Sequence, residues 1–138
     1  MIIVDTNVIS EVLKPEPSRK VQSWMSSFGP AALFTTTITL AEVLYGVELI
    51  PAGRRRTALE LAVKKMFAGM VGTHILTFDE TAARAFAEIS AARRRKGRPI
   101  GELDAQIAAI ALSHGATVAT RNVQDFMDCG VELIDPWA

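Results

Sequence analysis

The amino-acid sequence predicts an α/β fold in three layers, with helices on both faces of a central, mostly parallel sheet of about five strands. Three observations lead to this prediction. Short runs rich in β-branched residues alternate along the chain with longer stretches of helical periodicity. The first run, Ile2 to Val4, is apolar throughout, as in a strand buried on both faces. Strands separated by helices form parallel crossover units, because parallel neighbours need a long connection.

The expected strands are short and carry mainly aliphatic or β-branched side chains. After the strand at 2–4, the next four runs cover residues 33–37, 74–77, 117–120 and 131–134.

Amphipathic or alanine-rich stretches between these runs predict the helices. Apolar residues spaced three and four apart form one stripe with Trp24 and Phe28 and a second with Met66, Phe67 and Met70, and both stripes are expected in the core. The longest helix and the last one should end at Gly97 and Gly115, because glycine favours the left-handed conformation found after helix ends. The expected helices lie around 21–28 and 59–70 and over 39–49, 81–96 and 103–114.

Composition narrows the functional classes. Apolar residues make up 49% of the 138 residues, which is enough for a packed core, and the length fits one domain over residues 1–138. The 15 basic residues balance 15 acidic ones, which excludes a strongly basic protein that coats nucleic acid. Cys129 has no cysteine partner for an internal disulfide, and no apolar run reaches the length of a membrane span. We therefore expect a cytoplasmic protein with no membrane partner.

Acidic residues from distant parts of the chain are expected at one edge of the sheet. Ligands of such folds bind at the carboxyl ends of the parallel strands, where the following helices begin. Asp5 directly follows the first strand, and Asp125 comes just after the fourth. Glu42 and Asp104 lie in the first turns of two helices that start at this edge. Their convergence is the main functional signal in the sequence.

Two of these acids also suit purely structural roles. Asp5 can cap a helix, since aspartate at a strand end often accepts hydrogen bonds from backbone amides. Glu42 stands three residues after Thr39, which is the spacing of a capping box. Against that role, its helical neighbours Tyr45 and Leu49 suggest that Glu42 lies on an inward face.

The other two acids differ in how strongly they indicate function. Asp104 shares an apolar stripe with Ile107 and Ala108, where a charge is costly unless it is paired or binds a metal, although helix amides could also bind it. Asp125 stands three residues after Asn122, so both suit the start of a helix. Asn122 is the alternative oxygen donor to Asp125 at this edge.

Clustered carboxylates predict a bound divalent cation. Neighbouring carboxylates repel and raise one another's pKa, and a cation removes that conflict. His74 and His114 are isolated, so the donor set is all oxygen and favours Mg²⁺ or Mn²⁺ over zinc. Such an ion activates water for attack on a phosphodiester. The sequence has no glycine-rich phosphate loop, serine elbow or dinucleotide fingerprint, which disfavours nucleotide hydrolysis, acyl transfer and redox chemistry.

Four motifs in order resemble those of PIN-domain ribonucleases, and most closely the VapC toxins of type II toxin–antitoxin modules. They are IVDTNVI at 3–9, TLAEVLYG at 39–46, IGELDAQIA at 100–108 and TRNVQDF at 120–126. The resemblance spans nearly the whole chain. It implies a PIN-like fold, Mg²⁺-dependent cleavage of RNA, a homodimer, and inhibition by a cognate antitoxin protein.

The resemblance also assigns roles to residues. Asp5, Glu42 and Asp104 match the three main acids of the family, and Asp5 and Asp104 match its usual metal ligands. The fourth acidic role is carried to Asp125, because Asn122 occupies the place where some relatives have aspartate. The hydroxyl and amide side chains expected to support the site are those of Thr6, Asn7, Thr120 and Asn122.

Surface charges give weaker signals. The runs Arg54 to Arg56 and Arg93 to Lys96 are interpreted as solvated faces. Arg121 is the better candidate for binding substrate phosphate, because it follows the fourth strand. Basic and aromatic residues do not interleave as in a base-stacking platform. By resemblance, an antitoxin segment would occupy an apolar groove between the N-terminal helices. The alternatives to an RNA-cutting enzyme are a non-catalytic module that binds RNA or antitoxin, and a nuclease that cuts DNA.

Overall fold

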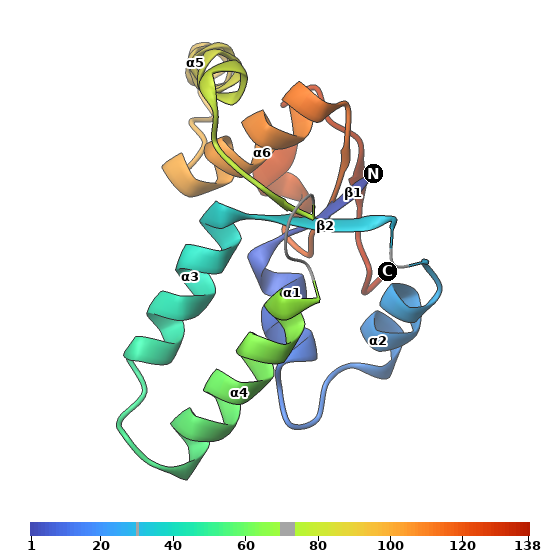
Figure 1. The fold of residues 1–138 in the computed structure, drawn as a ribbon. Helices are drawn as coiled ribbons and strands as arrows, with labels where there is room; N and C mark the ends of the chain where they lie inside the picture. Colours follow the sequence, from blue (N-terminus) through green and yellow to red (C-terminus); the bar gives the residue numbers. More distant parts are fainter. Residues whose placement is uncertain (30, 70–73) are drawn as a thin grey trace.

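The computed structural model describes residues 1–29, 31–69 and 74–138 and contains a five-stranded parallel sheet with helices on both faces (Figure 1). The predicted three-layer α/β fold is confirmed. The strand order is β3-β2-β1-β4-β5, so β1 lies at the centre, between β2 and β4. The pairing of Val4 with Ala119 brings the ends of β1 and β4 together. The strands are β1 (Ile2–Val4), β2 (Leu33–Thr36), β3 (Ile75–Leu76), β4 (Thr117–Ala119) and β5 (Leu133–Ile134).

Helices fill the intervals between the strands, as the periodicity predicts. Two short elements are additional to the five expected helices and begin where the sequence offered Asp5 and Asn122 as helix starts: a helix directly after β1, and a 3-10 helix, η1 (Val123–Phe126). Gly115 ends the last helix in the left-handed conformation, with φ 62°, as predicted. The helices are α1 (Thr6–Val12), α2 (Arg19–Ser26), α3 (Thr37–Glu48), α4 (Arg54–Ala68), α5 (Glu80–Arg95) and α6 (Glu102–His114).

Each face of the sheet has its own core, because successive strand residues point to opposite sides. Ile3 and Val118 belong to the core covered by α5 and α6. Val4 and Ala119 belong to the core on the other face, which α1, α2, α3 and α4 cover (Figure 1). Phe67 is buried there, and Trp24, Met25 and Met66 pack against it, which agrees with the expected stripes. Met70 lies outside the described residues.

Helix α3 begins two residues earlier than predicted. Thr36 caps it, because the Thr36 Oγ1 accepts a hydrogen bond from the Thr39 N–H at 3.1 Å. The capping box predicted from Thr39 and Glu42 is therefore wrong. The inward face was also misassigned: the buried side chains of α3 are those of Thr39, Val43 and Val47, whereas Tyr45 and Leu49 are each 66% exposed.

The described helices include none that is long and apolar enough to cross a membrane. Helix α6, which is rich in alanine and isoleucine, is buried along most of its length. It packs between the sheet and α5, with its first turn at the carboxyl edge of the strands. This placement brings Asp104 to the same edge as Asp5.

Candidate active site

Asp5 lies at the end of β1 with only 4% of its surface exposed. Its backbone N–H continues the sheet by donating to the Ala119 carbonyl at 2.9 Å. Its Oδ1 accepts the Thr6 N–H at 2.7 Å and so caps α1, and its Oδ2 accepts the Thr120 hydroxyl at 2.8 Å. The capping role and the site role are therefore compatible. The hydrogen bonds fix both carboxylate oxygens at the edge of the sheet.

Asn7 joins the two strand ends. Its amide Nδ2 donates to Asp5 Oδ2 and to Thr120 Oγ1, both at 3.2 Å. Its Oδ1 accepts the backbone N–H of Arg121 at 3.2 Å. The Thr120 hydroxyl also accepts the backbone N–H of Asn122 at 3.0 Å. These bonds hold the loop after β4 against the start of α1, as expected of supporting residues.

Glu42 reaches the site from α3 and is held by a hydroxyl. The Thr6 Oγ1 donates to the Glu42 Oε1 at 2.7 Å and lies 3.2 Å from the Thr39 Oγ1. The structure thus links α1 and α3 through side chains far apart in the sequence. One oxygen of the Glu42 carboxylate has no hydrogen bond from the described part of the chain.

Asp104 is half-buried in the first turn of α6, and no hydrogen bond from the described residues reaches its carboxylate. Burial, followed by repulsion from Asp5, Asp125 and Glu42, raises the pKa of Asp104 to about 6. Burial also raises the pKa of Asp5, where hydrogen bonds from Thr120 and Thr6 oppose it and the charges of Glu42 and Asp125 add to it. The site therefore holds excess negative charge that the protein does not fully neutralise.

Three of the four predicted acids, Asp5, Glu42 and Asp104, share one open cleft of about 430 Å³. Among residues 1–29, 31–69 and 74–138, no three acidic, histidine or cysteine side chains are close enough to form a complete metal site by themselves. A Mg²⁺ ion commonly takes one or two protein carboxylates and completes its shell with water. The oxygen-only donors Asp5 and Asp104 fit that coordination. The cleft is lined by Asp5, Thr6, Asn7, Ser10, Glu11, Lys14, Glu42, Asp104, Arg121, Asn122 and Trp137.

Asn122 and Asp125 are the two candidates for the fourth acidic role in the site, and the structure places them differently. Asn122 lines the cleft, although its side chain does not cap η1 as its position suggested. Asp125 is exposed within η1 and does not line the cleft. It acts at longer range, since its charge raises the pKa of both Asp5 and Asp104. A direct ligand role for Asp125 stays a prediction.

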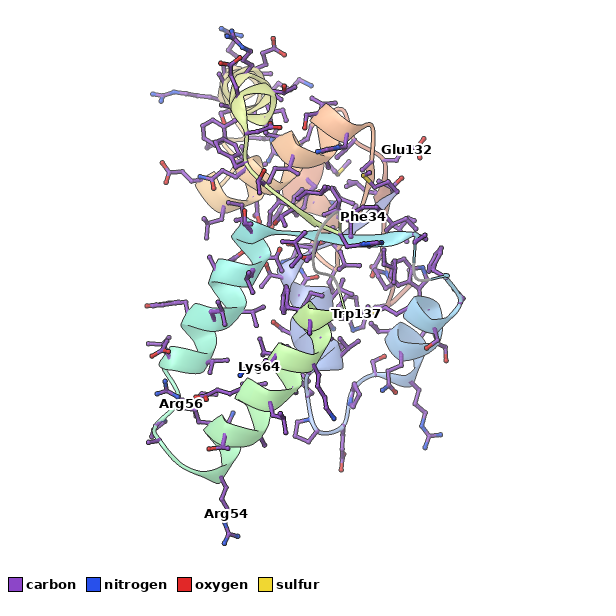
Figure 2. The ribbon with its side chains drawn as sticks, viewed as in Figure 1. Phe34, Arg54, Arg56, Lys64, Glu132 and Trp137 are labelled. Atoms are coloured by element: carbon purple, nitrogen blue, oxygen red, sulfur yellow. The ribbon has the colours of Figure 1, made fainter. Side chains whose placement is uncertain are left out.

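Arg93 was misinterpreted from the sequence as part of a solvated run. Its side chain is only 4% exposed, and it donates to the backbone carbonyls of Arg98, Asp125 and Met127 at 2.7 to 2.9 Å. It thereby fixes the segment that contains η1. The available signal was its position four residues after the buried Ile89, on the inward stripe of α5. By contrast, Arg54 is exposed and extends away from the start of α4 (Figure 2).

A PIN domain family model matches residues 2–127 of the chain. The chain belongs to the PIN domain family. One relative of this PIN domain is VapC ribonuclease Y4jK of Sinorhizobium fredii, with 39% identity over 99% of this chain and 98% of the relative. Another is the plasmid stability protein StbB of Pseudomonas syringae pv. tomato, with 41% identity over 99% of each chain. Toxin FitB of Neisseria gonorrhoeae is 36% identical over 99% of each chain.

Solved structures agree with this assignment to the PIN domain family. The PIN domain resembles a chain in the structure of FitAB bound to an IR36 DNA fragment, with a TM-score of 0.93 and 36% identity, over 100% of this chain and 96% of that one. It also resembles a chain in DNA-bound VapBC from Salmonella typhimurium, with a TM-score of 0.83 and 29% identity, over 98% and 97% of the two chains. The cleft described above lies within this shared fold.

Proposed function

We propose that this PIN domain protein is a metal-dependent endoribonuclease that hydrolyses RNA phosphodiester bonds and acts as the toxin of a toxin–antitoxin pair. One observation is central to the proposal: the half-buried Asp104 carboxylate shares a cleft with Asp5 and Glu42 and has no hydrogen bond from the described residues. A bound cation would neutralise this excess negative charge. The relative named a VapC ribonuclease, which aligns over almost the whole chain, supports RNA as the substrate class.

The metal would be Mg²⁺, or Mn²⁺ in its place, held by Asp5 and Asp104. Both are oxygen donors, and together they leave coordination positions for water. When bound, such an ion makes a water molecule more acidic and stabilises the negative charge that develops on the phosphodiester.

The surrounding residues orient the carboxylates. Thr120 and Asn7 both donate to Asp5 Oδ2, whereas Asp5 Oδ1 accepts only the Thr6 N–H and so keeps a lone pair for a ligand. Thr6 binds one oxygen of Glu42, so its other oxygen can accept a proton or a hydrogen bond from the attacking water. Asp125 adds negative charge at the edge of the cleft. Arg121, exposed beside the acids, would bind a substrate phosphate.

The toxin assignment also predicts protein partners. One relative is named a toxin, FitB, and two of the similar chains come from the structures of FitAB and VapBC. In this chain an apolar groove of about 840 Å³ runs between α3 and α4, with Leu44, Leu61 and Ile75 in its lining. Leu44 is 47% exposed and Leu61 58% exposed. We propose that a cognate antitoxin segment covers this surface and that the protein forms a homodimer.

A cleavage assay tests the enzymatic proposal. The purified protein is incubated with a mixed pool of tRNA and mRNA, first with Mg²⁺ and then with EDTA. We expect discrete RNA fragments with Mg²⁺, none with EDTA, and none from Asp104→Asn. Glu102→Gln is the matched control, because Glu102 is an exposed acid in the same first turn of α6 and should retain activity. Cleavage that persists in EDTA, or intact RNA under all conditions, would contradict the proposal and favour a non-catalytic module; cleavage of matched DNA alone would favour a DNA nuclease.

A further inference from the structure

Arg121, the proposed phosphate-binding residue, forms a pair with Trp137, a residue that has no role in the proposed function. The Arg121 guanidinium lies over the indole ring of Trp137, with its central carbon 5.1 Å from the ring centroid. Both residues line the cleft that contains Asp5 and Asp104. They follow β4 and β5, which are adjacent in the sheet, so the fold brings them to the same edge.

Trp137 is held in place by both its backbone and its side chain. Its backbone N–H donates to the Asp135 Oδ1 at 2.9 Å, which fixes the turn after β5. Its side chain packs against the core on the α1 and α2 side of the sheet, where Figure 2 labels it. The ring therefore packs against the protein and also contacts the Arg121 guanidinium. It can restrict the conformations of a long side chain that rests on it.

Arg121 is anchored at its backbone, and its guanidinium rests on Trp137 without a hydrogen bond or ion pair to the described residues. Its backbone N–H donates to Asn7 Oδ1 at 3.2 Å, next to Asp5. Its side chain is exposed, and within the described part of the chain no carboxylate oxygen lies within ion-pair distance of its guanidinium. Lys14, the other cation that lines the cleft, already pairs with Glu11 at 3.1 Å. Arg121 thus offers unused donors at the edge of an acidic cleft.

We propose that Arg121 and Trp137 form a subsite for a phosphate of the RNA strand next to the bond that is cut, in which Trp137 is a positioning residue that holds the guanidinium toward the cleft. The guanidinium has a planar set of donors that matches two phosphate oxygens, whereas an ammonium group does not. An acidic cleft repels a polyanion, and a fixed cation at its edge lowers that barrier. This inference depends on the proposed RNA substrate and adds how the strand is bound.

The test is a double-mutant cycle measured by binding rather than by cleavage. Fluorescein-labelled oligouridylate is titrated with the protein in the Asp104→Asn background at low ionic strength, and affinity is read from anisotropy. We expect Arg121→Ala to weaken binding by about tenfold or more, because charge-assisted hydrogen bonds are lost. Trp137→Leu should weaken it about two- to fivefold, and Trp137→Phe less, since phenylalanine keeps an aromatic face. In the Arg121→Ala protein, Trp137→Leu should have no further effect.

Salt dependence and matched controls complete the test. Arg121→Ala should reduce the slope of log affinity against log salt by about 0.7, the value for one phosphate contact on a single strand. Arg94→Ala removes an exposed arginine on α5 and Trp24→Leu removes a tryptophan on α2, and neither should change the affinity. If Trp137→Leu fails to fold by circular dichroism, the emission of Trp137 in a Trp24→Phe protein replaces it. That emission should change when oligouridylate is added to the protein that retains Arg121, and it should stay constant when oligouridylate is added to the Arg121→Ala variant.

Several results would overturn the subsite. Additive losses from Arg121→Ala and Trp137→Leu would show that Trp137 contacts the RNA independently. Unchanged affinity of Arg121→Ala, or no binding of oligouridylate by the parent protein, would exclude a sequence-independent phosphate contact. The proposed function is tested separately by Mg²⁺-dependent cleavage with the unsubstituted protein. If the unsubstituted protein cleaves RNA but the Arg121→Ala and Trp137→Leu variants bind RNA as tightly as the parent, the subsite is rejected and the proposed function stands.

Discussion

Asp104→Asn is expected to stabilise the metal-free protein while it abolishes cleavage. The pKa of Asp104 rises from 3.8 to about 6, with burial as the main cause and the neighbouring acids adding to it. A rise of about two pKa units corresponds to at most roughly 3 kcal/mol against folding at neutral pH. Solvent screening of the half-exposed side chain lowers this to about 1.5 kcal/mol. The substitution also removes the attraction of the Asp104 charge to the N-terminal end of α6, which reduces the gain in stability by roughly 0.5 kcal/mol. The net gain should be about 1 kcal/mol.

The sign of the pH dependence follows from the raised pKa. Because the folded protein binds the Asp104 proton more tightly than the unfolded chain does, the penalty is absent below pH 3.8, grows as the pH rises to about 6, and is constant above it. Urea unfolding in EDTA, followed by circular dichroism, should show Asp104→Asn more stable than the parent at pH 7.5 and progressively less so toward pH 4. Added Mg²⁺ should stabilise the parent but not the variant. Equal stability at pH 7.5, or a gain that does not depend on pH, would refute the electrostatic reasoning.

Two further changes test how the site is supported. Arg93→Met should lower the free energy of unfolding by about 3 kcal/mol, because the carbonyls of Arg98, Asp125 and Met127 lose their buried donor. Chemical unfolding measures this loss of stability, and an equal loss in the variant of the exposed neighbour, Arg94→Met, would contradict the prediction. Thr120→Val keeps the side-chain shape but removes a hydrogen bond that holds the pKa of Asp5 down. The affinity of the protein for Mn²⁺, measured by calorimetry, should therefore fall about 10- to 100-fold. An unaltered affinity would show that the hydroxyl does not support a metal ligand.

The fold and the positions of the main acids were predictable from local patterns. Asp5 follows a fully apolar strand, and Asp104 interrupts an apolar helical stripe, so each stands out against its own neighbours. The carboxyl edge of a parallel sheet then brings such residues together without any knowledge of side-chain contacts. The described structure places both in one cleft with Glu42.

Other features depend on contacts that no local pattern contains. Thr36, rather than Thr39, caps α3, and the face of α3 that packs against the core carries Thr39, Val43 and Val47 rather than Tyr45 and Leu49. Two threonines so close in the sequence have the same capping propensity, so tertiary packing decides between them. The Arg121–Trp137 pair forms across two strands and is invisible as an interleaved sequence pattern.

The most direct test of the central claim is calorimetric titration of Mn²⁺ into the parent protein and into Asp5→Asn and Asp104→Asn. Glu132→Gln serves as the control, since Glu132 is exposed near β5 and away from the cleft. Parent and control should bind Mn²⁺ alike, and each of the two aspartate variants should lose that binding while it keeps its circular dichroism spectrum. Undiminished binding by both aspartate variants would contradict the claim that acids distant in the sequence share one metal ion.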